Sequence, residues 1–400
     1  MQETQARRPG STTPAPPAPP AFALWQLGFR PFYLLAAVFA ALGVGLWALQ
    51  YTGKMNGAYL QGALWHGHEM LFGYTLAVIV GFLLTAVRNW TGQPTPTGTA
   101  LMALTVLWVA GRLLILTPWS AVAAVVNAAF PFAAAVGIAL PIVRARNTRN
   151  YFFIGLLALL GVIQLATHAA FAGMVDASPR FTLQLGFDVV LFIMVVMAGR
   201  VVPMFTNNGV PGTQAARRPW LERYSLGAVI ALFLADHAPG VPALAPAVAL
   251  VAAVAHAWRL ALWQPWRTFG TPLVWVLHVA YAWIVVHLLL RGLAGFGWVA
   301  ESLALHALTV GGIGGLTLGM ITRTARGHTA RPLAADGFET TAYLLVFAAA
   351  VARVFGAMLL PGLHVFWMQL SALLWAAAFG LYAVRYWPVL TRPRLDGKPG

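Results

Sequence analysis

The stretch Trp65-His66-Gly67-His68-Glu69-Met70-Leu71-Phe72-Gly73 opens an apolar run that reaches residue 87. A run of this length fits a membrane-spanning helix, which needs about 20 predominantly apolar residues. Two imidazoles and a carboxylate are costly at the start of such a helix, and ionisable groups in spanning segments point to function by default. The alternative is that they cap the helix in the wet membrane interface. We favour function, because a second apolar run begins in the same way at His306.

The composition of the whole chain agrees with a membrane protein. Of its residues, 60% are hydrophobic and 9% are charged, whereas a soluble domain carries about 25% charged residues. We therefore predict an all-α polytopic membrane protein, with residues 23–390 forming one transmembrane domain. Residues 1–22, rich in Pro, Ala and Thr, are predicted to be a disordered tail, and residues 391–400 a short cytoplasmic tail.

Twelve apolar runs are long enough to be read as transmembrane helices, although the seventh is short. They lie near 31–51, 64–87, 98–117, 119–143, 150–173, 181–205, 222–238, 241–263, 272–294, 300–325, 337–360 and 363–388. Twelve crossings place both termini on one side of the lipid bilayer. The fold expected is a single bundle of twelve helices.

The formal net charge of +15 does not indicate nucleic-acid binding, because the charges fall between the apolar runs. With the termini inside, the outer loops hold only Lys54, Arg180 and Arg291. This asymmetry predicts cytoplasmic termini by the positive-inside rule. The chain has no cysteine, which excludes thiolate iron–sulfur ligation and covalent c-type haem attachment. A metal would need His, Met, carboxylate or backbone ligands.

Two of the predicted helices, 64–87 and 300–325, share a weak internal repeat. In each, a histidine is followed at the same offsets by two glycines and an arginine: His68 with Gly73, Gly81 and Arg88, and His306 with Gly311, Gly319 and Arg326. The offset of eight helices fits three four-helix units. In that arrangement helix 181–205 would be the third equivalent, and it carries Asp188 in place of the histidine.

Most of the ten histidines fall near the outer ends of the predicted helices, which suggests a metal or haem layer near that face. A helix turns about 100° per residue, so His66 and His68 should diverge by about 200° and His278 and His287 by about half a turn. Ligands must therefore come from different helices. We predict that His68 and His306 ligate one haem b. The candidate metal ligands are His66, His68, His278, His287 and His306.

Four further ionisable residues are candidates for the same region. Arg112 and Arg353 lie within predicted helices and could clamp the two haem propionates, or each could pair with a buried acid such as Asp188 or Glu69. Glu69 and Asp188 are the candidate proton-relaying, catalytic acids. Glu69 could instead orient an imidazole from the second coordination shell.

Taken together, these stretches resemble the NnrS family of bacterial inner-membrane proteins. The resemblance is carried by residues 28–32, 65–73, 81–87, 89–92, 200–208 and 306–333. Ala330 departs from it, since a glycine is expected there. The resemblance implies twelve helices, haem and copper, and a link to nitric oxide metabolism and protection from nitrosative stress. The three-unit plan also resembles the core of haem–copper oxidases, although Ala304 stands where that core has a second histidine.

Three classes of function stay open at this point: an enzyme, a transporter or assembly factor, and a membrane sensor. The first is a haem-dependent oxidoreductase that reduces nitric oxide. It would require an open metal position, protons, and electrons from a donor that the sequence does not identify. The second is a transporter or assembly factor for copper, haem or a nitrosylated metal complex, which twelve glycine-interrupted helices would also suit.

Overall fold

The computed structural model describes residues 22–238 and 240–398. Almost all of the predicted disordered tail, 1–22, lies outside the described residues. Within them the chain is helical, and a helix lies in each of the twelve predicted ranges. Several of these helices are built from more than one segment, and the differences from the predicted ends are a few residues.

The described chain consists of consecutive helical runs joined by loops. They are α1 (Phe29–Tyr51); α2 (Gly62–His68) continued by η1 (Glu69–Thr75) and α3 (Leu76–Thr91); α4 (Gly98–Leu114); α5 (Ser120–Arg144); η2 (Thr148–Asn150) with α6 (Phe152–Phe171); α7 (Pro179–Gly209); α8 (Pro219–Asp236); α9 (Leu244–Leu262) with η3 (Pro265–Arg267); α10 (Pro272–Gly295); α11 (Glu301–His306) continued by η4 (Ala307–Gly314) and α12 (Gly315–His328); α13 (Gly337–Val351) continued by η5 (Ala352–Gly356) and α14 (Ala357–Leu359); and η6 (Pro361–Leu363) with α15 (His364–Thr391).

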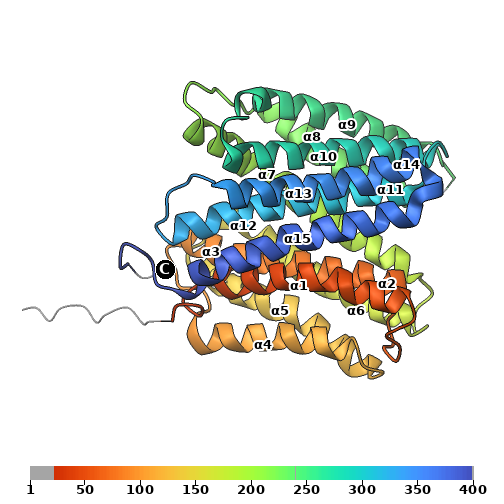
Figure 1. The fold of residues 1–400 in the computed structure, drawn as a ribbon, viewed down its shortest axis with the longest axis horizontal. Coiled ribbons are helices and arrows are strands. Elements are labelled where there is room, and N and C mark those ends of the chain that lie inside the picture. The colour runs from red at the N-terminus through yellow and green to blue at the C-terminus, as the bar shows by residue number, and fades with distance from the viewer. Residues whose placement is uncertain (1–21, 239, 399–400) are drawn as a thin grey trace, which may run out of the picture.

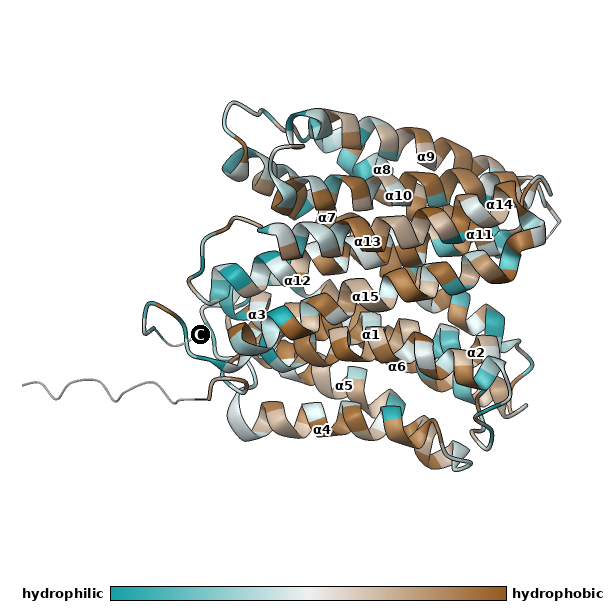
Figure 2. Ribbon diagram, viewed as in Figure 1, coloured by the Kyte–Doolittle hydropathy of each residue, from teal (hydrophilic) through white to brown (hydrophobic). Residues whose placement is uncertain are grey.

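In the described part of the chain, ten of these runs are long and apolar enough to cross a membrane. The two others are α4, an apolar helix of 17 residues, and α8, of 18 residues. Hydrophobic residues dominate the middle of the bundle, and hydrophilic residues gather toward its two ends (Figure 2). The chain is therefore a multi-pass membrane protein with about ten candidate spans.

The helices run side by side along one direction, with α4 and α5 at one edge of the bundle and α8 and α9 at the other (Figure 1). The two ends of the described chain meet, because the N–H of Ala23 donates to the carbonyl of Thr391 at 2.7 Å. The labels α2, α11 and α14 lie at the opposite end from the C-terminus (Figure 1). The segments α2 and α11, which carry His66, His68 and His306, therefore share one end of the molecule.

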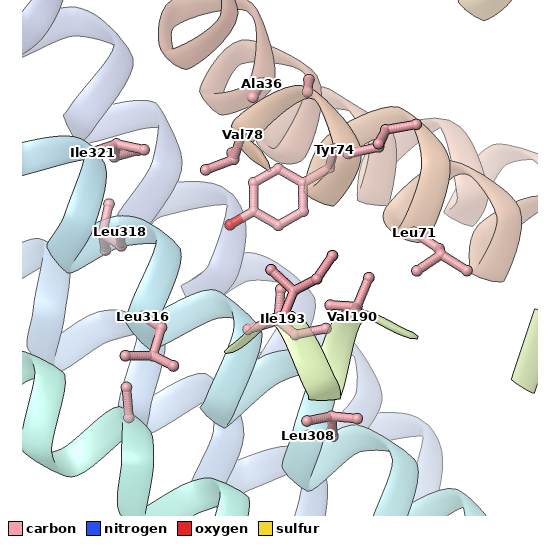
Figure 3. Packing of buried hydrophobic residues seen from close by; sticks show 14 of the residues in the cluster. Ala36, Leu71, Tyr74, Val78, Val190, Ile193, Leu308, Leu316, Leu318 and Ile321 are labelled. Atoms are coloured by element: carbon pink, nitrogen blue, oxygen red, sulfur yellow. The ribbon is translucent and has the colours of Figure 1, made fainter. Parts of the chain in front are cut away.

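The core between the helices is mainly apolar and also contains buried polar and charged side chains. Figure 3 shows Tyr74 of η1 pointing across the core toward the helix that carries Leu318 and Ile321. The Tyr74 hydroxyl finds a hydrogen-bond partner there in the hydroxyl of Thr317. A buried phenol needs such a partner, so this contact ties η1 to α12, the two segments that the sequence relates by its repeat.

Ala330, just after α12, has a left-handed backbone with a φ of 58°. This is the position where the resemblance leads us to expect glycine. A left-handed conformation costs an L-residue roughly 1–2 kcal/mol, while glycine adopts it freely. The departure is therefore a local strain and does not disturb the fold.

We expect Ala330→Gly to stabilise the protein by about 0.5–1 kcal/mol, since relief of the strain exceeds the entropy that glycine adds to the unfolded chain. Thermal unfolding of the purified protein in detergent would measure this. The control is Ala348→Gly on an exposed part of α13, which should cost about 1 kcal/mol. A loss of stability in Ala330→Gly would contradict the strain argument.

Candidate functional site

Three segments near the histidine-rich end are π-helical. The first, η1 (Glu69–Thr75), begins directly after His68, and the second, η4 (Ala307–Gly314), directly after His306. The third, η5 (Ala352–Gly356), carries Arg353. π-Helical turns are rare and occur frequently at functional sites. The two histidines that the sequence repeat relates, His68 and His306, are thus each followed directly by a π-helical segment.

A cavity of about 910 Å³ opens at this end of the bundle. Ligand pockets usually occupy 300–1,000 Å³, so its size suits a cofactor or a small molecule. Its polar walls carry histidines and arginines, and its apolar walls include large aromatic rings. The lining residues used below are His66, His287, His306, Arg291, Arg353, Trp47, Tyr74 and Trp375.

His306 and His66 contribute imidazoles to this cavity from two different helices. The Nδ1 atom of His306 hydrogen-bonds the carbonyl of Ser302 at 2.6 Å, which fixes the ring and leaves Nε2 as the other available nitrogen. The His66 ring lies 4.9 Å from the Trp47 ring, and its buried Nδ1 has no hydrogen-bond partner among the described residues. Each histidine therefore presents a nitrogen that the protein does not use.

Arg353 is an electrostatic neighbour of both His66 and His306. Its Nη1 atom is buried and has no hydrogen-bond partner among the described residues. A buried guanidinium without a carboxylate is costly, and Arg is well suited to bind carboxylate groups with two hydrogen bonds. Arg353 is thus a cationic group at the cavity wall with one nitrogen atom that can donate to an anionic ligand.

Asp188, predicted as a catalytic acid, is engaged in an ion pair. Its Oδ1 accepts hydrogen bonds from Nη1 of Arg291 and from Nε2 of Gln184, each at 3.0 Å. Arg291 also pairs with Asp236. This set links α7, α8 and α10 beside the cavity, and it gives Asp188 a structural partner that the sequence did not identify.

The other two histidines proposed as metal ligands lie apart from each other. His287 of α10 lines the cavity, where Nδ1 hydrogen-bonds the Ala304 carbonyl at 2.8 Å and the buried Nε2 has no partner among the described residues. His278 hydrogen-bonds the hydroxyl of Thr206 at 2.8 Å and is not part of the cavity lining. The two side chains point about half a turn apart around α10 and therefore have different surroundings, as helical spacing predicts.

A second polar group is buried beside the cavity and is not among the residues that line it. At its centre, Nδ1 of His68 hydrogen-bonds Oε1 of Glu69 at 2.8 Å, and Nη1 of Arg112 lies 3.3 Å from the same oxygen. Arg112 also hydrogen-bonds Oδ1 of Asn127. His68 and Glu69 are completely buried. For Arg112, the structure contains the ion pair with a buried acid, which was one of the two roles considered above.

His68 does not share the cavity wall with His306. Its ring lies 4.9 Å from the ring of His168, at the end of α6. The pairing of His68 with His306 on one haem stays a prediction, and the structure instead places His66 on the wall that contains His306. His168, Tyr59 and Gln164 join the His68 cluster from outside the candidate set, and only the outer-end position of His168 hinted at this in the sequence.

No group of three or more His, Cys, Asp or Glu side chains in the described residues is arranged to hold a metal ion.

The glycines of the two related helices allow close side-chain packing. A Cβ on Gly314 would lie 2.5 Å from the ring of Trp375, and one on Gly315 would lie 2.6 Å from the ring of Phe347. A Cβ on Gly73 would lie 2.5 Å from Nη1 of Arg112 and 2.7 Å from the Phe39 ring. Gly73 is therefore the residue that lets the Arg112 guanidinium reach Glu69.

We expect Gly73→Ala to destabilise the protein by about 1–3 kcal/mol, because the added methyl group displaces Arg112 from its carboxylate. Thermal unfolding in detergent measures the change. Gly380→Ala in α15 is the matched control, because a Cβ there meets nothing within 4 Å and alanine is the better helix former. Equal melting temperatures for Gly73→Ala and wild type would contradict the packing argument.

The apolar helices, the cavity at one end of the bundle and the buried histidine–carboxylate–arginine cluster define a polytopic membrane protein with two polar centres at one face. The family model described as NnrS protein matches residues 23–394. The chain therefore belongs to the NnrS family, which is linked to the nitric oxide response. No curated protein matches the chain.

Proposed function

We propose that this chain binds a haem b in the cavity, with copper as a second metal, and acts on nitric oxide or on a nitrosylated metal complex. One observation carries the proposal: His66 and His306 line a cavity of about 910 Å³ beside Arg353, whose guanidinium has an unused buried nitrogen. Two imidazoles from different helices are the usual protein ligands of a b-type haem in a helical bundle. Arg353 would bind a propionate.

The protein's own contribution to this chemistry follows from its side chains. The hydrogen bond from His306 to the Ser302 carbonyl orients the imidazole, and orientation of this kind raises ligand basicity. Trp47 and Trp375 supply apolar walls to the cavity. When bound, the haem would supply an iron that binds nitric oxide and exchanges electrons with a donor.

The visible spectrum of the purified protein tests this proposal directly. Samples should be oxidised, reduced, and reduced with nitric oxide added. We expect haem b bands that shift when nitric oxide binds, and consumption of nitric oxide by the reduced protein would extend the proposal to an enzyme. A protein purified from haem-replete cells without any haem band would overturn it and would favour transport of another ligand.

We propose further that the chain crosses the bilayer twelve times with both termini in the cytoplasm of a bacterial inner membrane. The N–H of Gly98 donates to the Trp25 carbonyl, and the N–H of Tyr59 to the Thr117 carbonyl, so α4 connects the two ends of the bundle. The N–H of Ala216 donates to the Leu262 carbonyl, which sets α8 antiparallel to α9. The arrangement of three four-helix units would then resemble the haem–copper oxidase core.

Reporter fusions test the orientation. A fusion after Lys398 and one in the loop near Arg146 should report a cytoplasmic location, because basic residues accumulate in loops on that side. A fusion near Lys54 should report the opposite side. A cytoplasmic signal from the Lys54 fusion would overturn the topology.

A further inference from the structure

His68 and His168 form a pair of buried imidazoles outside the cavity. They come from α2 and α6, far apart in the sequence, and their ring centroids lie 4.9 Å apart. His68 has 0% of its surface exposed, and His168 has 4%. Two neutral imidazoles at this distance in the interior of a membrane protein gain little from each other, so their proximity needs another cause.

Each ring is anchored through the same nitrogen. Nδ1 of His68 hydrogen-bonds Glu69 Oε1 at 2.8 Å, and Nδ1 of His168 hydrogen-bonds the Tyr59 hydroxyl at 2.5 Å. A carboxylate that holds the far nitrogen of an imidazole is the usual second-shell support of a metal-ligating histidine. The two anchors therefore leave Nε2 as the free nitrogen of both rings.

The free nitrogens lack adequate protein partners. Nε2 of His168 is buried and has no hydrogen-bond partner among the described residues, and the same is true of Oε1 of Gln164. Nε2 of His68 has only the Gln164 side-chain nitrogen at 3.5 Å, which is beyond a good hydrogen bond. A buried polar atom without a partner costs about 1–3 kcal/mol, so a ligand that joins these atoms would be strongly favoured.

We propose that His68 and His168 bind a monovalent copper ion through their Nε2 atoms, with Gln164 beside it. Imidazole nitrogen suits copper, and monovalent copper is satisfied by two such ligands. Zinc would need four ligands. This assignment deepens the proposed function, in which copper is the second metal.

The charge of the cluster also favours a monovalent ion. Glu69 is the carboxylate of the cluster, and Arg112 lies 3.3 Å from it and balances its charge. The two imidazoles that would surround the ion are neutral, so the cluster supplies no net negative charge to balance the charge of the ion. Burial of an uncompensated charge costs much more for a divalent than for a monovalent ion. The same ion pair holds Glu69 in place to orient His68.

The experiment uses full-length protein in detergent, stripped of metal with a chelator and titrated anaerobically with Cu(I) against a coloured Cu(I)-binding competitor. We expect a single ion per chain. His68→Ala and His168→Ala should each abolish copper binding, and Tyr59→Phe, which removes one anchor, should weaken binding about 10–100-fold.

The matched control is His256→Ala, which should bind copper as wild type does. His256 is also fully buried, with Nδ1 on the Tyr281 hydroxyl at 2.6 Å and a free Nε2, but in the described part of the chain its ring packs on Tyr281 and not on a second imidazole.

X-ray absorption of the copper-loaded wild type gives an independent answer if a variant does not fold. We expect a monovalent edge and nitrogen neighbours of the imidazole type. Binding that survives His68→Ala, or equal binding of Zn(II) at the same residues, would overturn the assignment. Haem bands are read on the same samples: haem without a copper site overturns this inference alone, and copper without haem overturns the haem proposal alone.

Discussion

The haem b proposed for this protein should be lost from His306→Ala and from His66→Ala. Both side chains line the same cavity, and each has a nitrogen that the protein leaves free. A haem held without covalent attachment by two imidazoles would lose one of them in either variant, so the bound haem should fall to near background. The measurement is the ratio of haem to protein from the visible spectrum of each purified variant, alongside size-exclusion chromatography as a test of folding.

His328→Ala is the control, because His328 ends α12 at the other end of the same helical run as His306. It should keep wild-type haem content. His68→Ala is the decisive comparison: it should retain haem if His66 is the partner of His306. If His68→Ala loses haem while His66→Ala keeps it, the ligand pair is the one that the sequence repeat alone suggests, and the cavity assignment is wrong.

Hydropathy was enough to predict the arrangement of the chain in helices. Each predicted apolar range contains a helix because a segment in lipid must satisfy its backbone groups internally. The same reasoning does not settle how many helices cross, since α4 and α8 are shorter than the others. The charge pattern predicts the side of each loop, and the count of twelve crossings stays a prediction.

Helical spacing predicted that His66 and His68 face different directions, but not that they belong to two separate polar centres. His66 and His68 are two residues apart, and they face different surroundings: His66 lines the cavity with His306, while His68 lies against His168. What spacing cannot provide is the partner on another helix. The repeat related His68 to His306 by depth along the bundle, but lateral position depends on packing that only the structure contains.

The π-helical segments after His68 and His306 were also beyond prediction from sequence. Their glycines indicate close packing, which the structure contains at Gly311 and Gly314, but no residue pattern specifies a π-helical turn. Similarly, Arg112 could have faced a propionate or a buried acid. The choice depends on Gly73, whose missing side chain opens the path from Arg112 to Glu69.

Arg112→Met should be among the most destabilising single substitutions in the protein, at about 3–5 kcal/mol, because it leaves the buried Glu69 carboxylate without its counter-charge. Glu69 is completely buried, so water cannot replace the guanidinium. The double variant Arg112→Met with Glu69→Gln should recover part of the loss, since the two residues are coupled by about 0.5–3 kcal/mol. Thermal unfolding of Arg112→Met and of the double variant in detergent, each compared with wild type, measures both losses.

The matched control is the exposed pair between Arg385 and Asp336, whose side chains are 45% and 40% exposed. Arg385→Met should cost no more than about 1 kcal/mol, because solvent screens both charges. If Arg112→Met proves as mild as Arg385→Met, Glu69 carries no charge in the folded protein. The balance of charge that favours a monovalent ion beside His68 would then fail as well, so this comparison tests the electrostatic basis of the copper site without any metal present.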